Sequence, residues 1–242
     1  MELKSIPTEI IELPSKGITY PESNPLSEGK LEMRYMTAAH EDILTNQNLI
    51  AKGTVLTELM KALIVTKINF DDLIIGDKNA VMVAARILGY GKNYIFEYQG
   101  EEQNVDLTTI KDKVIDLSIF TKGVNEFPYK FQETNDEITF KILTHGDEVK
   151  VQQELEGLKK LNKDANPEIS TRLKFIITSI NGNREMKNIR DFVDNYLLAK
   201  ESRELRKYIQ KIQPDVDLTF FPSGSETKAS IPIGLKFFWP EL

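Results

Sequence analysis

The chain has 242 residues, of which 40% are apolar and 28% are charged, with 13 Gly and 10 Pro. This composition is ordinary for a globular protein, and the length allows a sizeable core in one large domain or two small ones. The formal net charge of −6, with a pI near 5.2, argues against a broad basic face for duplex DNA or RNA. We therefore expect no nucleic-acid partner.

Cysteine content and hydropathy exclude further classes of site. There is no cysteine, so disulfides and thiolate metal sites are absent, and only His40 and His145 remain as nitrogen ligands. We expect no zinc and no other cofactor. No apolar run approaches the roughly 18 residues of a membrane span, and the start of the chain does not resemble a signal peptide. We expect a protein without a membrane span that stays in the compartment where it is made.

Residues 1–36 form the first predicted unit, an extended N-terminal segment followed by a strand. Leu31, Met33 and Tyr35 alternate with charged residues, which predicts a half-buried strand. The preceding segment combines apolar anchors with prolines that prevent helix formation. We predict that it docks on another protein through Leu13, Pro14, Ser15, Lys16, Gly17, Tyr20 and Pro21. The alternative is that it completes this chain's own fold.

Residues 37–122 are predicted to form a helical block and a hairpin. Thr37, Thr54 and Asp77 are expected to cap three helices. The first helix spans 38–49, the second carries apolar residues from Leu56 to Ile64, and the third ends at Gly89-Tyr90-Gly91. Residues 94–98 and 104–107 follow as the strands of the hairpin.

Residues 123–242 are predicted to repeat this order with a hairpin, a helical bundle and a C-terminal hairpin. The strands are expected at 129–132 with 138–143, and at 218–221 with 228–233. Apolar spacing predicts helices at 146–161, 168–180 and 188–212, the last burying Phe192 and Tyr196 among others. The expected class is α+β, mostly helical with small antiparallel hairpins, arranged in two helix-plus-hairpin halves.

Polar residues give no combination typical of catalysis. His40 and His145 are expected to be surface or capping residues, and neither has a Ser or Cys neighbour suited to nucleophilic attack. Asp71-Asp72 with Asp77 would be a poor cation loop because Leu73, Ile74 and Ile75 lie between them, so helix capping by Asp77 is favoured. We expect a protein that is not an enzyme.

Two further sets of residues are candidates for partner binding. Arg203 and Arg206 are three residues apart, share a helical face and can bind carboxylates, although bridging within the chain is the alternative. The C-terminal residues Phe237, Phe238, Trp239 and Pro240 supply aromatic anchors that either close this chain's own core or contact a partner.

An ordered set of short motifs resembles the T-even-type baseplate hub subunit family of contractile-tailed bacteriophages. The motifs are Leu13-Pro14-Ser15-Lys16-Gly17, Met36-Thr37, Gly76-Asp77-Lys78-Asn79, Gly89-Tyr90-Gly91, Gly146-Asp147-Glu148, Ile180-Asn181-Gly182, the 202–206 segment, Pro214-Asp215-Val216-Asp217 and Phe237-Phe238-Trp239-Pro240. The resemblance covers nearly the whole chain. It implies a structural or assembly component of the virion tail baseplate, made in the host cytoplasm, that contacts hub or tape-measure proteins. A homo-oligomer is left open as a further contact. The alternative is an assembly chaperone for those proteins that is absent from the virion.

The chain departs from the family in one respect. Many members carry Cys-x-x-Cys pairs of a zinc ribbon where this chain has the hairpins around 99–103 and 221–225. Without those cysteines the hairpins must be held by packing. Phe220, Phe221, Ile231 and Ile233 are the residues expected to provide it, against Phe237 and Trp239.

Overall fold

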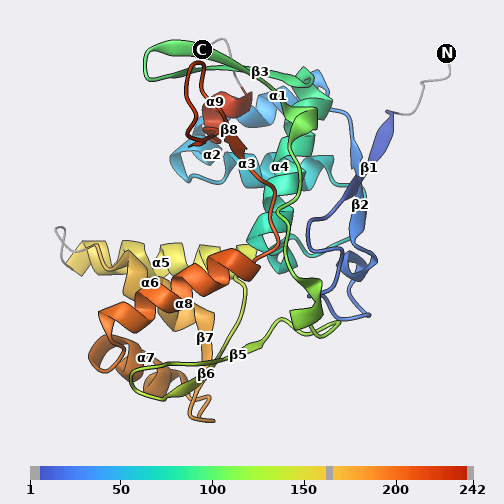
Figure 1. The fold of residues 1–242 in the computed structure, drawn as a ribbon. Coiled ribbons are helices and arrows are strands. Elements are labelled where there is room, and N and C mark those ends of the chain that lie inside the picture. The colour runs from blue at the N-terminus through green and yellow to red at the C-terminus, as the bar shows by residue number, and fades with distance from the viewer. Residues whose placement is uncertain (1–5, 162–165, 239–242) are drawn as a thin grey trace.

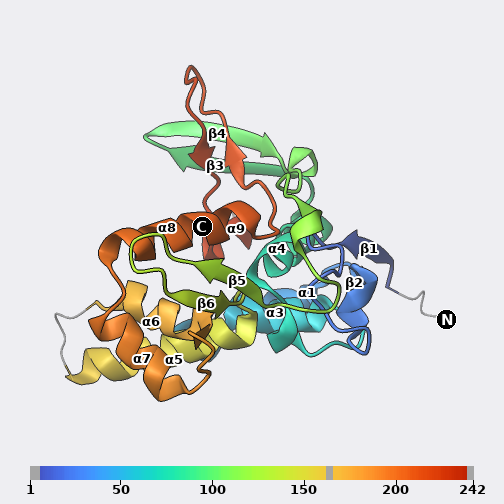
Figure 2. The same ribbon diagram turned by 60° about the horizontal axis from the view of Figure 1, so that its bottom comes forward.

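The computed structural model describes residues 6–161 and 166–238. Helices dominate, and the strands form separate antiparallel sheets of two or three strands. The α+β class predicted from the sequence is confirmed. Among the helices described, none is long and apolar enough to cross a membrane. Figures 1 and 2 show two lobes joined at the lower end of a central helix, with both described ends of the chain in the first lobe.

The first lobe begins with a two-stranded sheet and a set of helices. Strand β1 (Thr8–Glu12) pairs with β2 (Lys30–Arg34), so that Ile10 lies opposite Glu32. The helices are α1 (Ala38–Leu44), α2 (Gln47–Ala51), α3 (Val55–Leu63) and α4 (Ile75–Tyr90). Leu31 and Met33 of β2 point inward and belong to the same core as the apolar faces of α3 and α4. The predicted 38–49 helix is therefore two helices, with Asn46 capping the second.

Two hairpins distant in sequence pack together to complete this lobe. Strand β3 (Asn93–Tyr98) pairs with β4 (Glu101–Asp106), and β8 (Thr219–Phe220) pairs with β9 (Ala229–Ser230). The ring of Phe220 contacts the rings of Phe96 and Tyr98, with centroids 5.1 and 5.5 Å apart. The C-terminal hairpin, which the sequence grouped with residues 123–242, thus lies against the hairpin of the first lobe (Figure 2).

This packing bears on how the hairpins are held without cysteines. Phe220 and Ile231 are buried, and Ile233 packs against the core, as expected. Phe221 is 60% exposed and so does not serve this purpose. A hydrogen bond joins the two hairpins directly, since the backbone N–H of Ser223 donates to Oε1 of Gln103 at 3.2 Å. The tip of one hairpin therefore meets the second strand of the other.

The second lobe contains a three-stranded sheet and a helical bundle. The sheet has the order β5 (Phe127–Lys130), β6 (Glu137–Phe140) and β7 (Ile177–Ile180). The helices are α5 (His145–Leu161), α6 (Glu168–Ile176), α7 (Met186–Asn195) and α8 (Ala199–Ile212). The predicted helix at 168–180 ends at Ile176, because the β-branched run from Ile177 continues as β7. A final short helix, α9 (Leu235–Phe238), returns to the first lobe.

The predicted 188–212 helix is broken into α7 and α8. Ile189 and Leu205 are 16 residues apart, and 16 steps of about 100° would leave them roughly 160° apart around one continuous helix. Both are buried, so the break at residues 196–198 turns both apolar faces inward. Phe192, Val193 and Ile209 are buried as predicted, whereas Tyr196 lies at the break and is 64% exposed.

Candidate functional site

The N-terminal segment predicted to dock on a partner is built into this chain's own core. Leu13, Ser15 and Tyr20 are 0%, 0% and 3% exposed, and Pro14 and Gly17 are buried as well. The segment forms a sequence of turns instead of an extended strand, and Cβ at Gly17 would lie 2.3 Å from the carbonyl oxygen of Ser27. The prediction that its apolar anchors are held for another protein is therefore corrected. Lys16 and Pro21 are the members of the segment that stay accessible.

Asp77 is the residue that holds this segment by hydrogen bonds. Its Oδ1 accepts a hydrogen bond from the backbone N–H of Ser15 at 2.9 Å. Its Oδ2 accepts from the hydroxyls of Ser15 and Tyr20, each at 2.6 Å. Asp77 was predicted to cap α4, but the N-cap is Ile74, and Asp77 lies in the first helical turn with its carboxyl directed at the N-terminal turns. The sequence therefore identified Asp77, but the predicted partner of its carboxyl, the helix N-terminus, was wrong. The observed partners are Ser15 and Tyr20.

Burial governs the ionisation of this cluster. Asp77 is 0% exposed, and desolvation raises the pKa of its carboxyl above the ordinary value, although the hydrogen bonds from Ser15 and Tyr20 oppose the shift. Burial, and then the neighbouring Asp77 carboxyl, raise the pKa of Tyr20. Ser15 and Asp77 have no access to solvent, so the cluster holds the fold together and is not arranged to meet a substrate.

The chain returns to the same place near its C-terminus. Gly76 lies against residues 214–215, where a Cβ would come within 1.8 Å of the carbonyl oxygen of Pro214. Nδ2 of Asn79 donates to Oδ1 of Asp215 at 3.0 Å, and the backbone N–H of Lys113 donates to the carbonyl of Asp215 at 2.8 Å. Only glycine allows the backbone to approach the helix so closely. We call this meeting point of segments 13–21, 76–79, 111–113 and 214–217 the α4 junction.

His145 lies beside the α4 junction and is buried, contrary to the prediction of a surface or capping residue. It is 6% exposed, and its ring packs edge-on against Phe70 with centroids 4.8 Å apart. Its Nδ1 is 3.3 Å from Nζ of Lys78. Desolvation, and then the positive charge of Lys78, lower the pKa of His145 to about 4. His40, in contrast, accepts a hydrogen bond from the backbone N–H of Thr37, as a capping residue would.

The C-terminal anchors also belong to this chain's core. Phe237 and Phe238 are both 0% exposed, and Phe237 packs edge-on against Tyr94. The carbonyl of Phe237 accepts a hydrogen bond of 2.7 Å from Nε of Arg86, which is itself 2% exposed. Of the two alternatives for these phenylalanines, the structure shows that they close this chain's own core. Trp239 and Pro240 lie outside the described residues.

Arg86 belongs to the Ala85-Arg86-Ile87 motif of the family resemblance but was given no role from the sequence, although it is the largest fully buried side chain of the described residues. Its guanidinium donates to the carbonyls of Gly91 and Asn93 as well, at 3.0 and 3.2 Å, and lies over the rings of Tyr90 and Tyr94. Burial lowers its pKa. One cation thus joins the end of α4, the start of β3 and α9. An arginine on an otherwise apolar helical stretch is the sequence signal that could have identified it.

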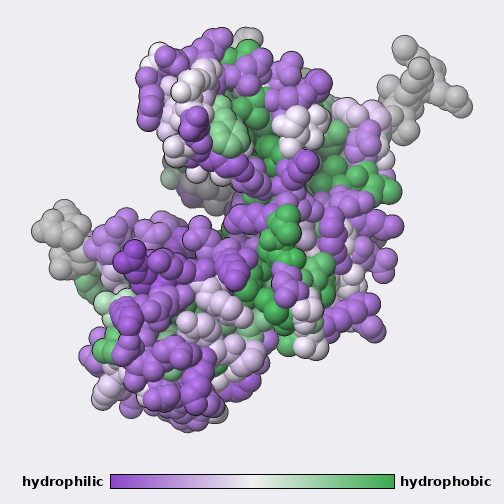
Figure 3. All heavy atoms as spheres, in the orientation of Figure 1, coloured by the Kyte–Doolittle hydropathy of each residue, from purple (hydrophilic) through white to green (hydrophobic). Residues whose placement is uncertain are grey.

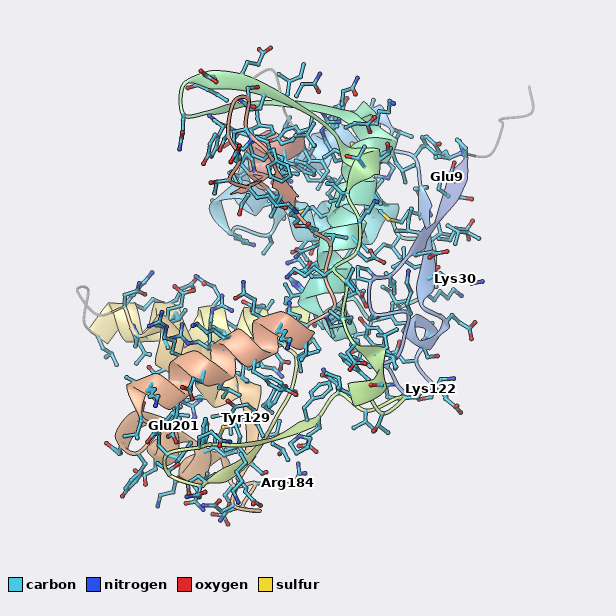
Figure 4. All side chains as sticks on the ribbon, viewed as in Figure 1. Glu9, Lys30, Lys122, Tyr129, Arg184 and Glu201 are labelled. Carbon is cyan, nitrogen blue, oxygen red and sulfur yellow. The ribbon has the colours of Figure 1, made fainter. Side chains whose placement is uncertain are left out.

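Several exposed apolar side chains lie on one segment, which contains the boundary predicted between residues 122 and 123. Residues 110–125 form a connector between the lobes, held to the N-terminal turns by an ion pair between Lys16 and Asp112 at 3.1 Å. Its exposed apolar side chains are Val114 at 101%, Leu117 at 40%, Ile119 at 39% and Val124 at 41%. Figure 3 shows hydrophobic surface gathered where the connector crosses this face, and Figure 4 places Lys122 at its lower end.

The predicted arginine pair remains on the surface. Arg203 and Arg206 are both exposed on α8. Nε of Arg206 donates to the carbonyl of Ser202 at 3.3 Å, and neither residue forms a salt bridge within the described residues. The structure therefore does not bring them together with the other predicted partner-binding residues.

Comparisons with protein-family models, with curated proteins and with solved structures found no match. Among the residues that the structure describes, no group of three or more acidic or histidine side chains is arranged to hold a metal ion.

Proposed function

We propose that this protein is a non-enzymatic structural or assembly component of a contractile bacteriophage tail baseplate, working through contacts with hub or tape-measure proteins. The observation that carries the proposal is the connector surface. Val114, Leu117, Ile119 and Val124 leave apolar side chains in water within eleven residues of one another. Exposed apolar surface that gathers on one segment is typical of protein–protein contact.

The positions of the resemblance motifs also support the proposal. Three of the motifs contribute to the α4 junction, namely residues 13–17, 76–79 and 214–217, and a fourth, residues 146–148, directly follows His145, whose ring lies beside Lys78. The polar groups of these motifs form hydrogen bonds within the fold. A protein that works as a rigid adaptor needs such a junction, because the relative position of its lobes determines where its outer surfaces lie.

The connector is also held firmly enough to act as a contact surface. The backbone N–H of Gly123 donates to the carbonyl of Ile18 at 2.8 Å, and that of Asp217 donates to the carbonyl of Lys111 at 2.7 Å. A partner that covers the connector would therefore lose little chain entropy in ordering it. This proposal therefore assigns the partner contact to the segment 110–125, and no longer to the neighbouring segment 13–21 predicted from the sequence.

The test is co-purification of tail intermediates with a tagged chain from infected cells. The variant Val114→Glu/Leu117→Glu should remain folded and lose the hub or tape-measure protein that the unchanged chain retains. Leu161→Glu is the matched control, since Leu161 is 86% exposed at the end of α5. Capture of the same partner by the connector variant would overturn the proposal. Purified virions then separate a component, which persists in them, from a chaperone, which does not.

A further inference from the structure

The outer side of helix α8 carries a stripe of positively charged side chains. Its exposed side chains include Arg203, Arg206, Lys207 and Lys211, and none of these forms a salt bridge within the described residues. Arg203 with Lys207, and Lys207 with Lys211, are like-charged pairs at i,i+4, and such pairs destabilise a helix. The partly buried Glu204 is the one acid in this stretch that is not fully buried. We call this stripe the basic face.

The outer side of hairpin β3–β4 carries the opposite charge. Glu97 and Glu102 lie directly opposite each other across the two strands, and both are exposed. Like charges in this position are destabilising. Within the part of the chain described, neither forms a salt bridge, whereas Asp106 at the base of the hairpin is paired with Lys92 at 2.9 Å. Ile95, on the same side of β3, is 45% exposed. We call this surface the acidic face.

The two faces lie on different lobes and both are uncovered. Figures 1 and 2 show β3–β4 at the outer end of the first lobe, with β8–β9 and α9 on its inner side. Helix α8 lies at the front of the second lobe in Figure 1. Its buried residues include Leu205 and Ile209, which helical geometry places on the opposite side of the helix from Arg203 and Lys207. Because of this separation, the basic face of one molecule cannot reach its own acidic face without disrupting the fold.

We propose that copies of this chain associate head to tail, with the basic face of one molecule docked on the acidic face of the next. Each face contains an internal repulsion that the other would relieve, and Ile95 would be covered in the contact. The interface is heterologous, so it produces a closed ring or an open chain and not a two-fold dimer. This inference goes beyond the proposed function and does not depend on it.

The contact is expected to be weak and sensitive to salt, because exposed ion pairs contribute little individually and are screened within about 10 Å at 0.1 M salt. Sedimentation velocity should show association at protein concentrations on the order of 10 µM to 1 mM in about 20 mM salt. Raising the salt to about 0.5 M should weaken it at least tenfold. A single monomeric species under all of these conditions overturns the proposal.

Charge reversal gives the decisive experiment. One variant, Glu97→Lys/Glu102→Lys, makes the hairpin basic, and a second, Arg203→Glu/Arg206→Glu, makes α8 acidic. Each alone should be monomeric and remain folded, since all four positions are exposed. An equimolar mixture should associate again, because each altered face then meets a complementary face on the other variant.

Lys159→Glu/Lys160→Glu on α5 is the control, since both lysines are exposed and lie on neither face. It should associate like the unchanged chain. If either reversal variant alone associates as well as the unchanged chain, or if the mixture stays monomeric, the pairing of these two faces is refuted.

Discussion

The N-terminal turns and the connector lie side by side, and they differ in how far their exposure could be predicted. Partner contact was predicted for the turns, which are buried, and not for the connector, which is exposed. Residues 13–21 combine apolar side chains with prolines, yet Leu13 and Tyr20 are buried in the core, and the Tyr20 hydroxyl donates a hydrogen bond to Asp77. Residues 110–125 contain the predicted boundary between two units and were given no contact role, yet Val114 is fully exposed. Proline and glycine predict that a segment is not helical. They do not indicate whether its apolar side chains turn toward the chain's own core or toward a partner.

The substitution Leu13→Ala is expected to have the largest effect on stability and tests this contrast most strongly. Leu13 is 0% exposed, so the substitution removes buried methyl groups and leaves a cavity. We expect a loss of about 2–5 kcal/mol in the free energy of unfolding, measured by urea denaturation. A loss below about 0.5 kcal/mol would mean that the N-terminal turns are not packed as described and would restore the docking interpretation.

Gly76→Ala tests the α4 junction at its closest contact. The new methyl group would lie 1.8 Å from the carbonyl oxygen of Pro214, so the backbone at residues 214–215 must move. We expect a loss of about 1–3 kcal/mol in the free energy of unfolding. Gly157→Ala is the control within α5, where a Cβ meets nothing within 4 Å. It should stabilise the protein by about 0.5–1 kcal/mol, because alanine favours the helix. Equal effects at both sites would contradict the close approach at the α4 junction.

His145 makes the region around the α4 junction sensitive to acid. Its pKa of about 4 in the folded protein lies below the ordinary value of 6.5, so the folded state binds the proton more weakly than the unfolded state. The resulting stability is present above pH 6.5 and is lost as the pH falls toward 4. The charged groups that act on its imidazole are Lys78, Asp71 and Lys61.

We expect the difference in unfolding free energy between the unchanged chain and His145→Gln to shift by about 2–3 kcal/mol between pH 7 and pH 4. Urea denaturation of both proteins across this range measures it. Parallel pH profiles for the two proteins would show that His145 titrates normally.

The smallest effect on stability is expected on the connector. Val114 is 101% exposed, so Val114→Ala should change the free energy of unfolding by no more than about 0.5 kcal/mol. Thermal denaturation beside Leu13→Ala gives the comparison directly. A loss above about 1 kcal/mol would place Val114 in the core and remove the exposed surface on which the proposed partner contact rests.

Local patterns predicted most of the elements correctly. The helices at 55–63 and 145–161 and the hairpins at β3–β4 and β5–β6 follow from periodicity, caps and turns that act over a few residues. The break between α7 and α8 was missed, although the opposite phases of Ile189 and Leu205 signal it. Strand β7 was missed because Ile177 continues the helical apolar spacing of α6.

The α4 junction could not be predicted from local pattern. Asp77 contacts Ser15 across 62 residues, and Asn79 contacts Asp215 across 136 residues. Capping rules place an aspartate near a helix start and say nothing of a distant hydroxyl that competes for its carboxyl. In the same way, the exposure of Val114 depends on what the rest of the fold leaves uncovered.

The meeting of the first and last hairpins has a consequence for the order in which the chain folds during synthesis. The rings of Tyr94 and Phe96, and the guanidinium of Arg86, find their partners in Phe220 and Phe237, which the ribosome adds more than a hundred residues later. The second lobe, residues 126–212, emerges complete in the interval. It is therefore free to fold first, while the lobe that was begun earlier keeps aromatic surface uncovered until the last residues are released.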